Sequence, residues 1–304
     1  MIAELQVTFP QVSLRHLCPL LGMSRSGVYA ARQRRAEERE EAAVVLRDAI
    51  ERIVLEFPGY GYRRVTHALR RAGWRVNAKR VLRVMREEAL LCQLQRRFVR
   101  TTDSRHGLGS YPNRLQAREL TGPNQAWVAD LTYVRLPTTF VYLAAIIDAF
   151  SRRCVGWEVS RQIDTELTLA ALERAIASRR PAAGLIHHSD HGVQYASLRY
   201  VARLKQIGAQ VSMAAVGNVY ENALAESFFA TLKREEVYLH EYRTFAEAET
   251  NLAHFLDDVY NHKRLHSRLG YRPPSEFEAR WLDERDDGRF LDERSALTLA
   301  LVHS

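Results

Sequence analysis

Long apolar runs and cysteines are scarce in this 304-residue chain, and each scarcity excludes a class of protein. The longest apolar run, 140–147, is well short of the ~18–20 residues that a membrane-spanning helix needs. The first twenty residues lack a basic stretch followed by an apolar core, so we expect no signal peptide. The three cysteines, Cys18, Cys92 and Cys154, are odd in number and far apart, which excludes a disulfide framework and a Cys-x-x-Cys zinc pair. A reducing cytoplasm is therefore the expected setting.

Basic residues are concentrated in the first part of the chain. Residues 1–125 hold 23 Lys+Arg against 12 Asp+Glu, a net charge of +11, whereas residues 126–304 have a net charge of −3. All but one of the 23 basic residues are Arg, whose guanidinium donates two parallel hydrogen bonds to phosphate. Ordinary solvated helix faces are the alternative explanation. The imbalance favours a nucleic-acid-binding part followed by a part with another role.

Residues 1–45 are predicted to form a helix-turn-helix unit. Apolar residues at helical spacing predict a short helix near 14–21, and Ser24 is placed to cap a second helix after a glycine. The second helix of such a unit can enter the major groove of DNA. Arg25 and Arg32 lie on this second helix and are candidate DNA contacts.

Residues 46–95 are predicted to form a second helical DNA-binding domain. Breaks at 58–61 and at Gly73 divide the segment into three amphipathic helices. A basic stripe lies opposite the apolar face of the third helix, at spacings i, i+4 and i+7: Lys79, Arg83 and Arg86. A single stripe of this kind also fits a solvated surface, but two basic helical units in tandem favour DNA binding.

Two further segments show little periodicity. Residues 96–122 are polar and contain adjacent arginines, glycines and a proline, so we expect a basic linker that runs along a phosphate backbone. Residues 281–304 form a C-terminal tail, in which 297–301 fits a short helix.

Residues 123–280 alternate strand and helix patterns in the order of a mixed α/β sheet. The expected strands are 126–136, 140–147, 154–159, 184–188 and 210–213. The first three are joined by short turns and form an antiparallel meander, whereas the longer connection to the fourth calls for a parallel neighbour. Helices are expected at 165–178, at 198–207 and from Asn222 onward.

Three acidic residues occupy positions that need a special explanation. Asp130 lies inside an otherwise apolar strand, where a carboxylate is costly unless it is paired or bound to metal. Asp190 directly follows the fourth strand, and ligand sites in α/β sheets lie at the carboxyl ends of strands. Glu226 lies on the last helix, on a face that it shares with Asn222 and Lys233. Acidic residues are common, so the set alone is a weak signal.

The spacing and the surrounding sequence resemble a known family. Asp190 and Glu226 are separated by 35 residues, as in the acidic triad of the retroviral-integrase-like DDE recombinases. Five ordered blocks resemble a narrower group, the transposases encoded by a second open reading frame of bacterial insertion sequences. The blocks are NQAWVADLTY (124–133), DAFSR with VGW (148–157), HSDHGVQYAS (188–197), AESFFATLKRE (225–235) and YNHKR with LGY and a proline (260–274). Upstream, GYGYRR (59–64) resembles the helical domain that precedes the core.

The resemblance implies a fold and an activity. The fold is a ribonuclease-H-like α/β core, with a mixed five-stranded sheet flanked by helices, preceded by all-α helix-turn-helix units. The activity is that of a transposase, which binds the terminal inverted repeats of its element, cuts at the ends and joins them to new DNA. Asp130, Asp190 and Glu226 are then catalytic ligands of two Mg²⁺ or Mn²⁺ ions, which activate the attacking oxygen and stabilise the leaving one. Lys233 would hold a phosphate, and Asn222 would contact DNA.

The implied partners are double-stranded DNA, at element ends and at the target, and further copies of the chain on that DNA. The resemblance leaves open a fusion with an upstream-frame helix-turn-helix protein. The expected location is the cytoplasm, in association with the nucleoid and without membrane contact. The chain departs from the family pattern at Glu221, at His191 and at Ala214-Ala215, where basic or polar groups near the site are missing.

Other interpretations remain open at this point. Three histidines around Asp190, namely His187, His188 and His191, are compatible with a zinc site. Neighbouring strand residues point to opposite faces, however, so His187 and His188 cannot easily reach one ion. A catalytically degenerate DNA-binding relic is the alternative to an enzyme, and the complete triad argues against it. A ribonuclease acting on RNA–DNA hybrids is a third possibility, against which the helical DNA-binding units argue.

Overall fold

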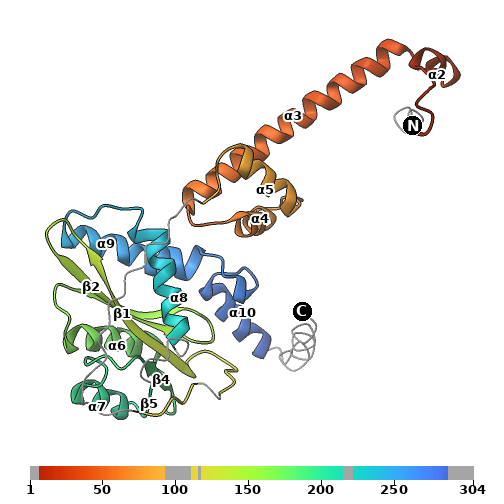
Figure 1. Cartoon of the computed structure of the whole chain (residues 1–304). Coiled ribbons are helices and arrows are strands. Elements are labelled where there is room, and N and C mark those ends of the chain that lie inside the picture. Colours follow the sequence, from red (N-terminus) through yellow and green to blue (C-terminus); the bar gives the residue numbers. More distant parts are fainter. Residues whose placement is uncertain (1–6, 93–110, 116–117, 215–221, 287–304) are drawn as a thin grey trace. The chain divides into compact units, whose positions relative to one another are not determined.

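The computed structural model describes residues 7–92, 111–115, 118–214 and 222–286 of the chain (Figure 1). The chain forms two compact units, Met1–Leu91 and Cys92–Ser304. Most of the expected linker 96–122, the expected helix 297–301 and the departures at Ala215 and Glu221 lie outside the described residues. Within the part that the structure describes, no helix is both long and apolar enough to cross a membrane.

The first unit is all-helical, as predicted. Its helices are α2 (Leu14–Leu20), α3 (Arg25–Glu56), α4 (Tyr62–Arg71) and α5 (Ala78–Glu87). The Ser24 hydroxyl caps α3 by accepting a hydrogen bond of 3.0 Å from the Gly27 amide. Asn77 caps α5 in the same way, accepting from the Lys79 amide at 2.8 Å. The cap at Ser24 was predicted from the sequence.

The secondary structure differs from the predicted division at residues 45 and 46. The single 32-residue helix α3 runs through this position without a break. The physical reason is local composition, because residues 28–57 contain neither glycine nor proline and are rich in Ala, Glu and Arg. The helix ends only before Pro58, since the residue that precedes a proline disfavours helical geometry.

The C-terminal part of α3 packs with α4 and α5 around a small apolar core. Its fully buried members are Leu46, Ile50, Tyr60, Val65, Leu69, Val81 and Met85. The basic stripe lies on the other side of α5, where Lys79, Arg83 and Arg86 are all exposed. Arg25 and Arg32 on α3 are exposed as well. The predicted amphipathic arrangement is therefore confirmed, whereas the DNA-contact role of these side chains stays a prediction.

The second unit is built on a five-stranded mixed sheet with the order β3-β2-β1-β4-β5. The strands are β1 (Ala126–Arg135), β2 (Phe140–Asp148), β3 (Cys154–Ser160), β4 (Ile186–Ser189) and β5 (Gln210–Met213). β1, β2 and β3 form the predicted antiparallel meander, and β4 pairs in parallel with β1 and β5. Each boundary agrees with the sequence prediction to within two residues.

Helices cover both faces of this sheet (Figure 1). On one face, α6 (Thr165–Arg179) and α7 (Leu198–Gln206) pack on a core that includes Trp127, Ala129 and Ile146. Gly156 allows α6 to approach closely, since a Cβ there would lie 2.4 Å from the Ala171 carbonyl oxygen.

The other face of the sheet is covered by the C-terminal helices. These are α8 (Ala223–Leu232), the π-helical turn η2 (Lys233–Val237), α9 (Phe245–His254), the π-helical segment η3 (Phe255–Lys263), the short helix η4 (Ser267–Leu269) and α10 (Pro274–Asp286). The core that α8, α9 and η3 form with the sheet contains Leu143, Ile147, Phe228 and Leu256. A bidentate ion pair between Arg264 and Glu235, with atoms 2.6 and 2.7 Å apart, joins the segment after η3 to η2.

Candidate active site

Sheet register places Asp130 and Asp190 side by side. β1 and β4 run in parallel, and the last pair in their register is Ala129 with Ser189. Asp130 and Asp190 are the next residue on each chain, so they lie at the same level on neighbouring strands. Asp130 is partly exposed at this position. The sequence prediction placed one of these residues inside a strand and the other directly after one, and the structure confirms both placements.

The alternation of side chains along β1 shows which face of the sheet Asp130 occupies. Ala126 and Val128 pack against Ala225 of α8, and Asp130 follows them on the same face. Glu226 is the next residue of α8 after Ala225 and lies in the exposed first turn of that helix. Asp130 therefore lies on the face of the sheet that α8 covers, Asp190 follows the neighbouring strand β4, and the charges of Asp190 and Glu226 both act on Asp130.

The charges of these residues are coupled. The pKa of Asp130 is raised to about 8, by burial first and then by the negative charges of Asp190 and Glu226. A hydrogen bond of 2.7 Å from the Leu131 amide and the charge of Lys233 oppose this shift. Burial also raises the pKa of Glu226. A carboxyl group that is difficult to ionise beside two others is typical of a functional site, because such a cluster stabilises a cation.

Lys233 is held at the same site. It begins the turn η2, and its Nζ lies 5.3 Å from the centre of the Tyr133 ring. Burial lowers the pKa of Lys233, whereas the nearby Asp130 raises it. Lys233 therefore acts electrostatically on Asp130, and its predicted role at the acidic group stays a prediction.

Asn222 is buried, whereas Glu226 on the same predicted helix face is exposed. It is the residue before α8, only 7% exposed, and its side chain makes no capping hydrogen bond. Its Oδ1 atom is buried without a hydrogen-bond partner. Because the amide is buried, direct contact with a DNA phosphate would require this part of the chain to rearrange, and the proposed contact stays untested.

A tight turn after β4 orients Asp190. Its Oδ1 atom accepts a hydrogen bond of 2.9 Å from the Gly192 amide. A Cβ on Gly192 would lie only 2.9 Å from the same oxygen, so glycine is the residue that fits here. His191, where the family usually has a basic residue, is 9% exposed. The turn therefore fixes the orientation of the Asp190 carboxylate.

The histidines of β4 have structural partners on opposite faces. His187 Nε2 lies 3.0 Å from the Tyr200 hydroxyl of α7, and His188 Nδ1 lies 2.9 Å from the Ser212 hydroxyl of β5. Burial lowers the pKa of His187 to about 3, so its ring is neutral. Among the described residues, no three acidic, histidine or cysteine side chains stand close enough to hold a metal ion as they are placed. The same holds for Asp130, Asp190 and Glu226 as they are placed, whereas the hydrogen bonds of His187 and His188 to separate partners argue against a zinc ion shared by these two histidines.

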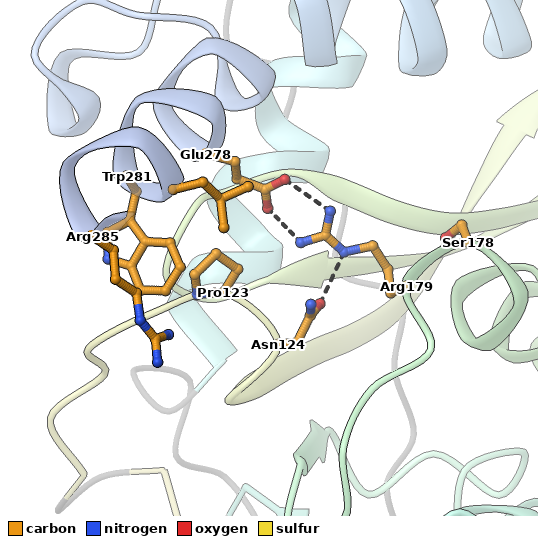
Figure 2. A pocket seen from close by; sticks show the side chains of 8 residues that line it. Pro123, Asn124, Ser178, Arg179, Glu278, Trp281 and Arg285 are labelled. Atoms are coloured by element: carbon orange, nitrogen blue, oxygen red, sulfur yellow. Dashed lines mark hydrogen bonds and ion pairs between the residues drawn. The ribbon is translucent and has the colours of Figure 1, made fainter. Parts of the chain in front are cut away.

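Two features of this unit were not found from the sequence. One is Tyr195, whose buried hydroxyl has no hydrogen-bond partner. The other is a hollow of about 320 Å³ where α10 meets the core (Figure 2). Figure 2 shows Glu278 facing Arg179 and Arg179 facing Asn124. The nitrogen–oxygen distances between Arg179 and Glu278 are 2.7 and 2.8 Å, and Arg179 donates to Asn124 at 2.9 Å.

The hollow is not the acidic site. Asn124 precedes β1, and the buried Asp148 that accepts from its amide at 2.6 Å pairs with Trp127 at the beginning of β1. Asp130 lies further along the strand. The ion pairs of Glu278 therefore attach α10 to the start of the sheet, and only their long sequence separation hid them from sequence analysis.

Comparison with protein families agrees with this architecture. An HTH-like domain matches residues 39–98, and integrase core domains match residues 121–219 and 207–274. The helical match spans α4 and α5, and the two core matches together include Asp130, Asp190 and Glu226.

Two retroviral integrase structures are among the solved structures that match this chain. The intasome of simian T-cell lymphotropic virus matches with 15% identity over 72% of this chain and 70% of that one, at a TM-score of 0.46. The HTLV-2 integrase catalytic core in complex with magnesium matches with 14% identity over 52% of this chain and 97% of that one, at a TM-score of 0.40.

Curated relatives are similar over almost their whole length. The transposase for insertion sequence element IS904 of Lactococcus lactis is 37% identical over 81% of this chain and 98% of its own. The transposase for IS629 of Shigella sonnei is 39% identical over 88% and 92%, and the transposase InsF for IS3A of Escherichia coli is 34% identical over 88% and 94%. With its HTH-like domain, its ribonuclease-H-like core and these relatives, the chain belongs to the transposases of bacterial insertion sequences, which are DDE-type polynucleotidyl transferases.

Proposed function

We propose that this transposase binds the terminal inverted repeats of its own element and performs metal-dependent strand cleavage and strand transfer with Asp130, Asp190 and Glu226. The observation on which the proposal depends most is the parallel register of β1 and β4, which places Asp130 beside Asp190. Two carboxylates at adjacent positions, with a third on the helix that covers them, are the donor set that phosphoryl transfer on DNA requires.

The donor set fits a hard divalent cation. All three groups are carboxylates, the oxygen ligands that Mg²⁺ and Mn²⁺ prefer, and few are needed because Mg²⁺ keeps several waters. The raised pKa of Asp130 supports the same proposal, since like charges gather there without a cation between them. We propose two Mg²⁺ or Mn²⁺ ions, which would activate the attacking oxygen and stabilise the leaving one. The magnesium bound to the HTLV-2 integrase core is consistent with this proposal.

The chain's own residues then have separate tasks. Asp130, Asp190 and Glu226 hold the cations and are not general bases, because a carboxylate bound to a cation has little basicity. Lys233, which lies close to Asp130, attracts a phosphate oxygen of the DNA by charge. The Gly192 amide keeps Asp190 in a fixed orientation.

The helical unit is proposed to recognise the element ends. Arg25, Arg32, Lys79, Arg83 and Arg86 are all exposed and come from the part of the chain with a net charge of +11. Arginine and lysine on exposed helices contact phosphates, and those at a helix that enters a groove contact bases. The integrase-type core, with a slight negative charge, contributes the chemistry instead.

Several finer aspects of the function are proposals as well. We expect the chain to act as a homo-oligomer on DNA, because two element ends must be processed together and joined to one target. We also expect it to work in the cytoplasm, at the nucleoid, since its substrate is chromosomal DNA. An upstream-frame helix-turn-helix protein remains a possible additional partner or fusion.

Cleavage of end DNA by an Asp130→Asn variant tests the proposal. The amide has nearly the same volume but binds Mg²⁺ weakly, so we expect cleavage to fall by at least about 10³-fold while end binding stays within twofold. Asp258→Asn, which changes an exposed carboxylate on η3, is the matched control and should cleave normally. Strand cutting at the unmodified rate by Asp130→Asn would show that the assignment of the triad is wrong.

A further inference from the structure

The hydroxyl of Tyr195 is an isolated polar group inside the apolar core of the second unit. The Tyr195 side chain is 2% exposed and packs edge-on against Tyr200, with ring centres 5.4 Å apart. Its oxygen is buried and has no hydrogen-bond partner. A buried hydroxyl normally finds a partner, because leaving it unsatisfied destabilises the folded state. The exception therefore needs an explanation.

The ring of Tyr195 lies close to the turn that holds Asp190. Tyr195 lies five residues after Asp190, and its amide donates to the Gly192 carbonyl oxygen at 3.0 Å, which closes the turn after β4. From the position of a Cβ on Gly192, the Asp190 Oδ1 atom is 2.9 Å away and the Tyr195 ring is 3.4 Å away. The carboxylate and the ring therefore flank the same glycine. Burial, then Tyr200, Asp130 and Asp190, raise the pKa of Tyr195, so its hydroxyl keeps its proton.

Tyr200 provides an internal comparison. It is equally buried, lies against Tyr195, and its hydroxyl is 3.0 Å from His187 Nε2. The core therefore satisfies one of two adjacent tyrosine hydroxyls and leaves the other open. The hydroxyl without a partner belongs to Tyr195, whose pKa is raised in part by the charges of Asp130 and Asp190.

We propose that Tyr195 is a positioning residue of the Asp130–Asp190 site, whose hydroxyl becomes hydrogen-bonded to the polar atoms that gather there when the two carboxylates hold a divalent cation. A bound cation brings its own waters and keeps both carboxylates ionised, so it supplies the partner that is otherwise missing. This inference rests on the proposed role of Asp130 and Asp190. Tyr195, which belongs to the core between the sheet and the helices α6 and α7, would then help to position the carboxylates of the site.

The proposal predicts that Tyr195→Phe makes the full chain more stable without a cation but weakens its binding of Mn²⁺. Without a cation, the variant loses an unsatisfied buried hydroxyl, so its Tm should rise by about 2–4 °C. Calorimetric titration with Mn²⁺ should show a Kd about tenfold weaker than that of the unmodified chain, the size of effect that outer groups of metal sites produce. A tyrosine that only fills space would leave the Kd unchanged.

Two further variants separate the possible outcomes. Tyr200→Phe removes a hydroxyl that has a partner, so its Tm should fall while its Mn²⁺ Kd stays within twofold. Asp190→Asn should abolish Mn²⁺ binding. If Asp190→Asn loses binding and Tyr195→Phe keeps it, the inference on Tyr195 is wrong and the metal site stands. If Mn²⁺ binding does not depend on Asp190, or does not occur, the proposed site is wrong and the inference fails with it.

Discussion

Asp130 is the residue at which burial and charge conflict most strongly. It lies on a strand whose neighbouring residues are mostly buried, and its pKa is raised to about 8 by burial and by Asp190 and Glu226. A fold that kept such a group only for stability would gain from an apolar replacement, because an unpaired charge in an apolar setting is unfavourable. The conflict is therefore best explained by function, and the Asp130→Asn and Tyr195→Phe experiments test that explanation at the level of single side chains.

His187 shows the opposite case, a titratable residue with a structural role. Its folded-state pKa is about 3, whereas an unfolded histidine titrates near 6.5. Below pH 6.5 the unfolded chain binds the proton that the folded chain refuses, so the free energy of unfolding decreases as the pH falls towards 3.

We predict a loss of about 2 kcal/mol from this residue between pH 7 and pH 5. Urea unfolding at a series of pH values, compared with a His187→Gln variant, isolates the contribution, since other groups titrate in both proteins. The variant should have the shallower dependence below pH 6.5. Equal slopes would mean that His187 is protonated in the folded protein.

At the scale of elements, α5 is an amphipathic helix with an apolar face packed inside its unit and a basic stripe on its exposed side. Val81 and Met85 are fully buried, while Lys79, Arg83 and Arg86 are exposed on the other side. The weak contact of 4.0 Å between Arg83 and Glu87 is solvated and adds little stability. A face of this kind is available for phosphates.

Replacing Lys79, Arg83 and Arg86 together with Ala should weaken binding to end DNA and reduce its salt dependence. Each lost phosphate contact should lower the slope of log K against log salt by about 0.9. Alanine favours helix, so the fold should persist, and circular dichroism provides that check. Replacing three other arginines with Ala, namely Arg174, Arg199 and Arg203 on α6 and α7, is the matched control. It should leave the salt dependence of end-DNA binding unchanged. If the slope does not change, the stripe is only a solvated face.

At the scale of the whole molecule, charge and chemistry are divided between two units. The helical unit belongs to the part with a net charge of +11, and the core that contains the three carboxylates belongs to the part with −3. The helix α10 is part of this core, because Glu278 of α10 forms ion pairs with Arg153 and Arg179 and so joins the helix to the sheet. The predicted end of the core at residue 280 would cut through α10, which continues to Asp286.

A fragment of residues 118–286 should therefore fold alone and bind Mn²⁺, yet bind end DNA poorly. Its length of about 170 residues is enough to bury its own core, and it keeps all three carboxylates and α10. Calorimetry with Mn²⁺ and gel shifts with end DNA measure the two properties separately. A fragment that bound end DNA as tightly and selectively as the full chain would place recognition in the core, contrary to the proposed roles of the two units.

The sequence by itself determined the elements and the identity of the acidic residues. Periodicity is a local property, so strands such as 126–136 and helices such as 165–178 were predicted to within two residues of β1 and α6. The spacing of Asp190 and Glu226 and the family resemblance then indicated the site. The predicted division at residues 45 and 46 falls inside the single helix α3, so it does not coincide with a break in the secondary structure.

Only the tertiary structure decided which distant residues meet. The adjacency of Asp130 and Asp190 depends on the register of two strands that are about 60 residues apart in sequence, and no local pattern encodes a register. The pairing of Glu278 with Arg179, the burial of Asn222 and the open hydroxyl of Tyr195 are likewise results of packing. Such contacts form between side chains that share no periodic relation, so local sequence patterns name the residues, whereas the folded chain determines which of them lie together.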